Sequence, residues 1–211
     1  MTYSAPVFST DTAAGTRGPR AWLSAQIADA REWCEGRSGW IRLPLLLYIL
    51  YAGVKHLRDT EYSDWTGGIT FGIHELGHVI MGWGGHFITA LGGSLWQILA
   101  PVITIVMFRR QRDWFAVAVG FAWLAFSAWG LATYVADARA MDLPLLGLSD
   151  DPEHDWNYLL GAMGLLKFDT AFALLIRIGA FLSWAAALTI GGWTCWRMIC
   201  SKTDLYAVLR N

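Results

Sequence analysis

Two histidines and a glutamate stand together inside an apolar stretch, Phe71 to Ile80. His74 and His78 are four residues apart, so on a helix they lie one turn apart and point to the same side, where two imidazoles can hold one metal ion. Glu75 lies beside them and can take a proton from a metal-bound water. Ionisable groups at membrane depth are costly unless they have a partner or a cavity. The pattern therefore predicts a zinc site with Glu75 as the catalytic base.

A catalytic zinc usually has three protein ligands and an open position for water, so this motif lacks one ligand. The strongest candidates lie in the acidic stretch 150–157, which places a histidine among carboxylates just before an apolar segment. We expect His154 to be the third ligand, with Asp155 or Glu153 orienting its ring. The alternative is that Asp155 binds the metal and His154 stabilises an oxyanion, and Glu153 is a further candidate ligand.

Three other polar residues bear on this site. Gln97 stands among apolar residues, and it either makes a hydrogen bond between helices or contacts the substrate or its oxyanion. His86 follows His78 by eight residues, about 12 Å along a continuous helix, which is too far to share the ion. We expect His86, and His56 at the end of an apolar segment, to lie near the membrane surface.

The composition places the chain among integral membrane proteins. Of its 211 residues, 55% are hydrophobic and only 16% are charged, against about 25% charged in a typical soluble domain. The net charge of −1 gives no sign of a nucleic-acid-binding surface. The three cysteines show no CxxC spacing and are expected to be unpaired.

The elements that must position the site are apolar helices. We expect an all-α, polytopic membrane helix bundle of four to six membrane segments, one of which can be re-entrant. The apolar segments are 40–57, 65–84, 86–108, 114–136 and 172–199, and 156–168 can lie on or partly enter the membrane. Residues 1–38 are expected to form a flexible N-terminal segment with a short amphipathic helix, 39–201 the membrane domain and 202–211 a C-terminal tail.

Basic residues gather in three places, at 17–42, 109–112 and 197–210. Five full spans cannot put all three on one side, whereas a re-entrant segment within 69–108 can, with both acidic connections outside. No cleavable signal peptide is visible in the polar residues 1–20. We expect a multi-pass protein of a bacterial inner membrane.

The stretch His74-Glu75-Leu76-Gly77-His78 resembles the metal-binding motif of the site-2 protease family of intramembrane zinc metalloproteases. The resemblance implies that His74 and His78 bind zinc and that Glu75 is the general base. Segment 92–97 loosely resembles the membrane hairpin that follows the metal helix in that family. The family's third ligand is an Asp in a Leu-Asp-Gly motif, which this chain lacks; Asp155 stands in roughly the expected region with different neighbours.

We therefore expect a membrane-embedded zinc metalloprotease that hydrolyses peptide bonds in or near transmembrane segments, with Glu75 activating a zinc-bound water. Its partners would be the lipid bilayer and a membrane-protein or membrane-proximal peptide substrate. Two alternatives remain open. One is a non-proteolytic membrane metalloprotein, such as an assembly factor or degenerate peptidase, and the other is a metal or proton transporter.

Overall fold

The computed structural model describes residues 18–144 and 153–208, with only the helical backbone described for 202–208. Within these residues the chain is all-helical, as predicted, and contains no strand. The elements are α1 (Pro19–Cys34), α2 (Leu43–Arg58), α3 (Gly67–Met81), η1 (Gly82–Gly84), α4 (His86–Arg110), α5 (Trp114–Ala136), α6 (Asp155–Ala162), η2 (Leu166–Phe168) and α7 (Asp169–Val208). Residues 1–17 of the predicted N-terminal segment lie outside the described residues, and α1 falls where the short amphipathic helix was expected.

Three of the described helices, α4, α5 and α7, are long and apolar enough to cross a membrane. The expected count of four to six segments is not supported, because α2 has 16 residues and α3 has 15. A helix needs about 20 residues to cross a hydrocarbon core of about 30 Å. The apolar run that carries the motif therefore forms a helix too short to be a full span.

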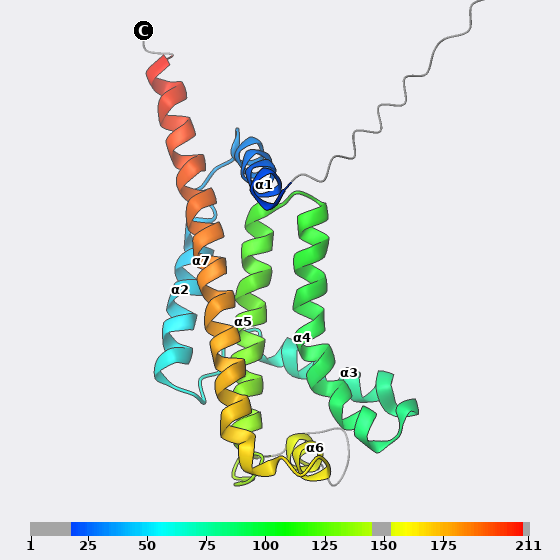
Figure 1. The fold of residues 1–211 in the computed structure, drawn as a ribbon. Helices are drawn as coiled ribbons and strands as arrows, with labels where there is room; N and C mark the ends of the chain where they lie inside the picture. Colours follow the sequence, from blue (N-terminus) through cyan, green and yellow to red (C-terminus); the bar gives the residue numbers. More distant parts are fainter. Residues whose placement is uncertain (1–17, 145–152, 209–211) are drawn as a thin grey trace, which may run out of the picture.

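The centre of the bundle is the antiparallel pair α5 and α7, with α2 packed beside them (Figure 1). Small side chains allow this close approach, including the buried Ala122, Ala125 and Ala187. Gly53 of α2 lies directly against Trp184 of α7, and the Trp184 indole N–H donates to the carbonyl of Ile49 at 3.0 Å. These contacts fix the rigid frame on which the remaining helices are placed.

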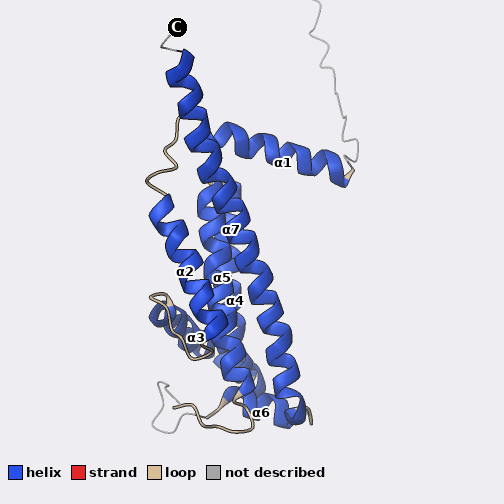
Figure 2. Ribbon diagram, turned by 90° about the vertical axis from the view of Figure 1, so that its left-hand side faces the viewer, coloured by secondary structure: helices blue, strands red, loops and turns tan. Residues whose placement is uncertain are grey.

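Helix α1 lies across one end of this frame (Figure 2). Its Asp29 pairs with Arg109 and Arg112 and accepts a hydrogen bond from the Trp114 indole at 2.9 Å, so α1 is tied to the connection between α4 and α5. The buried Cys34 contacts the carbonyl of Thr194 in α7. Helix α1, the connection between α4 and α5 and the part of α7 around Arg197 therefore lie at the same end of the bundle (Figure 1).

Helices α3 and α4 form a helical hairpin, which η1 connects at the opposite end of the bundle (Figure 1). Gly85 ends the turn at φ +80°, a conformation that favours glycine. The helices touch through glycines: a Cβ added at Gly77 would lie 2.4 Å from the carbonyl oxygen of Gly92, and one at Gly92 would lie 2.6 Å from that of Gly77. Helix α3 runs across the bundle rather than along it (Figure 1).

Candidate metal centre

Two histidines of α3 meet one carboxylate of α6. The Nε2 atom of His74 lies 3.1 Å from Oδ2 of Asp155, and Nε2 of His78 lies 3.3 Å from the same oxygen. The three ligand atoms all fall within 4.8 Å of one another. Among the described residues this is the one group of three or more His, Cys, Asp or Glu side chains close enough to hold a metal ion.

The predicted third ligand, His154, is not brought to this group; the alternative, Asp155, is. His154 is the N-cap of α6, and its Nδ1 accepts from the backbone N–H of Asn157 at 3.2 Å. Its Nε2 lies 3.4 Å from Oδ2 of Asp137, and its ring stacks on Tyr134. Both ring nitrogens of His154 therefore face Asn157 and Asp137, and the group of atoms close enough to share one metal ion contains Asp155 in place of His154.

The remaining candidate ligands also lie elsewhere. Glu153 pairs with His86 at 2.8 Å on the exposed side of the site, and His86 stacks on Tyr158. His56 was expected near the membrane surface, but it is buried and pairs with Asp64 at 3.1 Å. Asp155 is therefore the carboxylate that completes the group begun by the motif.

Both histidines are oriented by an acceptor behind the ring. Nδ1 of His74 lies 3.0 Å from the side-chain oxygen of Gln97, whose amide nitrogen donates to the carbonyl of Ser127 at 2.9 Å. Nδ1 of His78 lies 2.8 Å from the carbonyl oxygen of Thr89. Gln97 thus makes the interhelical hydrogen bond that was one of its two predicted roles, and both of these contacts are with other residues of the protein. Because a carbonyl oxygen can only accept, Nδ1 carries the proton in each ring, as is usual for metal-binding histidines.

This tautomer leaves three electron-rich atoms facing one another. In the neutral rings, Nε2 of His74 and Nε2 of His78 each present a lone pair to Oδ2 of Asp155, which also presents lone pairs when ionised. Burial acts to raise the pKa of Asp155, but the two histidines, which donate to this carboxylate when their Nε2 atoms are protonated, outweigh burial and hold that pKa below its usual range. Such an arrangement calls for a cation between the three atoms, either a proton or a metal ion.

The space between these atoms is kept open by Gly93 of α4. A Cβ added there would lie 2.6 Å from Nε2 of His74 and 2.6 Å from Nε2 of His78. A backbone without a side chain at this point leaves a cradle beside both nitrogens. Two imidazoles and one carboxylate, with their outer nitrogens held by acceptors, form a donor set suited to catalytic zinc. The residues present therefore fit the metal.

The site opens into a cavity of about 880 Å³, lined mainly by α3, α5 and the loop between α2 and α3. Glu75 lines this cavity and is half-buried. Within the part of the chain that the structure describes, its carboxylate takes part in no hydrogen bond or ion pair, in contrast to that of Asp155. A carboxylate that is next to the ligands and is not engaged elsewhere can act on a bound molecule.

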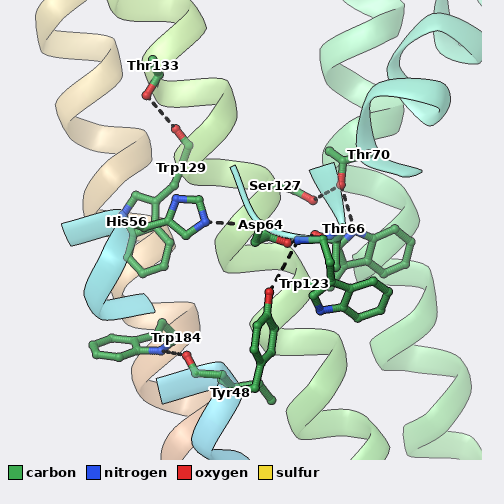
Figure 3. Close-up of polar contacts among 12 residues, drawn as sticks. Tyr48, His56, Asp64, Thr66, Thr70, Trp123, Ser127, Trp129, Thr133 and Trp184 are labelled. Carbon is green, nitrogen blue, oxygen red and sulfur yellow. Dashed lines mark hydrogen bonds and ion pairs between the residues drawn. The ribbon is translucent and has the colours of Figure 1, made fainter. Parts of the chain in front are cut away.

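The entrance to α3 is fixed by a second polar network (Figure 3). Asp64 accepts from the Thr66 backbone and hydroxyl at 2.7 and 2.6 Å and pairs with His56 of α2. Burial acts to raise the pKa of Asp64, but the hydrogen bonds with His56 and Thr66 outweigh it and keep that pKa below its usual range. One turn into α3, Thr70 contacts Ser127 of α5 and accepts a hydrogen bond from the Trp123 indole, also of α5. These two contacts fix the position of α3 along α5.

Sequence reasoning missed three contributors to the site. Thr89 acts through its backbone carbonyl, which no side-chain pattern reveals. Tyr134 resembles any aromatic residue near the end of an apolar segment. Gly93 was noted only as part of segment 92–97, for its loose resemblance to a membrane hairpin. A glycine inside an apolar helix also signals the close approach of another helix, and this signal could have identified it.

Comparison of the chain with protein-family models, with curated proteins and with solved structures finds no match.

Proposed function

We propose that this chain is a membrane-embedded zinc metallopeptidase that hydrolyses peptide bonds in or near transmembrane segments. One observation carries the proposal: His74, His78 and Asp155 point three electron-rich atoms at a cradle that Gly93 leaves open, and Glu75 stands beside them in a cavity. A site that only stabilised the helix packing would not need an open cradle or an unengaged carboxylate next to it.

In this proposal the two imidazoles and the Asp155 carboxylate hold zinc, while Gln97 and Thr89 keep the rings in the binding tautomer. A bound zinc ion would supply Lewis-acid chemistry, which lowers the pKa of water and polarises a carbonyl. The Glu75 carboxylate accepts the proton of the attacking water and then delivers it to the nitrogen of the leaving amine. These roles match the donor set and need no further charged residue.

The substrate class follows from the surroundings of the metal helix. The outer side of α3 exposes apolar residues, among them Ile69, Leu76 and Val79, and Trp65 and Trp83 are exposed beyond its two ends. We propose that this surface faces lipid and that α2 makes a fourth, shorter crossing beside α4, α5 and α7. The basic end of the bundle would then lie in the cytoplasm of a bacterial inner membrane. A membrane segment unwound near the hairpin could reach the site.

The test compares Glu75→Gln with the parent in proteoliposomes containing a fluorogenic transmembrane peptide. We expect the variant to keep one zinc per chain and to lose hydrolysis. Glu61→Gln is the matched control, because Glu61 is an exposed glutamate that lines the same cavity on the loop before α3. Cleavage by Glu75→Gln at the parental rate would contradict the role of Glu75.

The same preparation separates the rival functions. A parent that binds zinc tightly but cleaves none of a panel of membrane peptides would favour a non-proteolytic metalloprotein. Zinc uptake into the proteoliposomes, abolished by His78→Ala, would favour a transporter. Zinc-dependent cleavage without zinc flux is the result that supports the peptidase.

A further inference from the structure

Tyr134, in the last turn of α5, stands on the wall of the cavity opposite α3. Its hydroxyl oxygen accepts a hydrogen bond from the backbone N–H of Asp155 at 2.9 Å. Its ring stacks on His154 with centroids 4.3 Å apart and meets the ring of His74 edge to face at 6.1 Å. The phenol is therefore clamped between two imidazoles, and its oxygen is one hydrogen bond away from the residue that supplies the third ligand.

The hydrogen bond from the Asp155 backbone uses the acceptor capacity of this hydroxyl, and the Asp155 carboxylate also lies within hydrogen-bonding reach of its proton. A tyrosine O–H is both an acceptor and a single donor, and it is a neutral donor at neutral pH. Tyr134 lines the same cavity as Glu75 and both histidines, so its proton can face a carbonyl bound there when the Asp155 carboxylate is committed to the metal.

The other neutral donors around the ligands are already engaged. The Gln97 amide nitrogen donates to the carbonyl of Ser127, and the Nδ1–H groups of both histidines face their acceptors. None of these three groups can turn toward a substrate without releasing a ligand from its orientation. The Tyr134 hydroxyl can donate without such a loss.

We propose that Tyr134 is a catalytic residue whose hydroxyl donates a hydrogen bond to the oxyanion that develops on the substrate carbonyl during hydrolysis. This inference rests on the proposed function. Peptide hydrolysis converts a neutral carbonyl oxygen into an anionic one as the water oxygen bonds to carbon, and the charge is lost when the carbon–nitrogen bond breaks and the amine leaves with its proton. A donor fixed in place before reaction stabilises that charge without reorganisation.

The test compares Tyr134→Phe with the zinc-loaded parent in the same proteoliposomes. Losing one oxyanion donor typically lowers kcat by about 10²–10³-fold. We expect that loss with KM unchanged and with one zinc per chain retained. A phosphinic peptide, which imitates the tetrahedral intermediate, should bind the variant more weakly by a similar factor, whereas an uncleavable analogue of the ground-state peptide should bind both proteins equally.

Tyr48→Phe is the matched control, because the Tyr48 hydroxyl also accepts from a backbone N–H, that of Trp65, but away from the metal site. Its kcat should equal that of the parent. Loss of zinc from Tyr134→Phe would show that the hydroxyl only holds Asp155 in place, and a parental kcat would show that it donates nothing; either result overturns the proposal. If the parent hydrolyses no peptide, the proposed function fails, and equal affinity of parent and variant for the phosphinic peptide would then overturn the role of Tyr134 independently.

Discussion

Replacing Gly93 with alanine is the sharpest steric test of the metal centre. The added methyl carbon would lie 2.6 Å from Nε2 of His74 and of His78, and 2.7 Å from Cε1 of His78. A zinc ion bound to those nitrogens would lie about 2.0–2.1 Å from each of them. The methyl group and the ion therefore compete for the same small space.

The size of the effect follows from what must move. Contacts below 3.0 Å cannot persist, so either α4 shifts or both imidazoles rotate away from Gln97 and Thr89. Disturbing an outer-shell partner alone lowers metal affinity by about 10–100-fold. Direct intrusion at two ligands should exceed that range, so we expect zinc affinity to fall by more than about 100-fold. Overpacking of this kind should also cost about 1–3 kcal/mol of stability.

Competition with a chromogenic chelator in detergent micelles measures the affinity, and thermal unfolding without metal measures the stability. Gly72→Ala is the matched control, because an added Cβ at this exposed position of α3 meets nothing within 4 Å. It should keep parental zinc binding. Gly92→Ala serves as a second comparison, since its Cβ would strike the carbonyl of Gly77 instead of the ligands and should destabilise the hairpin. Parental zinc affinity in a folded Gly93→Ala protein would refute the assignment of the cradle.

Three further predictions follow from the same geometry. Asp155→Asn should abolish stoichiometric zinc binding measured by mass spectrometry, whereas His154→Ala should retain it; the reverse result would restore His154 as the ligand. Gln97→Leu should weaken zinc by about 10–100-fold, because the Nδ1–H of His74 loses its acceptor, and an unchanged affinity in chelator competition would contradict that role. Because the pKa of Asp64 is lower in the folded protein, its carboxylate stabilises the fold at neutral pH. That contribution is lost as the pH falls from the pKa of an unfolded-state Asp, about 3.9, through the lower pKa of the folded state. Asp64→Asn should therefore lower Tm at pH 7 and show a smaller further decrease than the parent toward pH 3; parallel Tm curves would exclude the effect.

The helices themselves were largely predictable. The apolar segments expected at 86–108 and 114–136 correspond closely to α4 and α5, because glycines precede His86 and charged residues follow Phe108 and Ala136. The segment at 65–84 was expected to be as long as a span, yet α3 stops at Met81. Its glycine-rich end turns the chain back at Gly85, and the apolar pattern alone does not show where a helix stops inside a hydrophobic run.

The site was predictable only where a fixed spacing decides the geometry. His74 and His78 had to share a face if they lay on a helix, and they do. The third ligand depended instead on which of three adjacent side chains turns inward at the start of α6. Asp is a more usual N-cap than His, so the ordinary capping rule would have placed Asp155 at the cap and left His154 free to bind. The observed cap is His154, stacked on Tyr134, and this tertiary contact reverses the assignment.

Segment 92–97 of α4 connects these separate findings. Gly77 of α3 packs on Gly92, and the histidine nitrogens face Gly93. The hydroxyl of Ser94 accepts the Trp156 indole N–H of α6 at 2.9 Å, and Gln97 holds His74. One and a half turns of a single helix thus position both the helix that supplies two ligands and the helix that supplies the third. In the sequence this segment stood out only for its loose resemblance to a membrane hairpin. In the folded protein the same residues are the platform of the site, since only small or hydrogen-bonding side chains let two other helices approach α4 at adjacent positions.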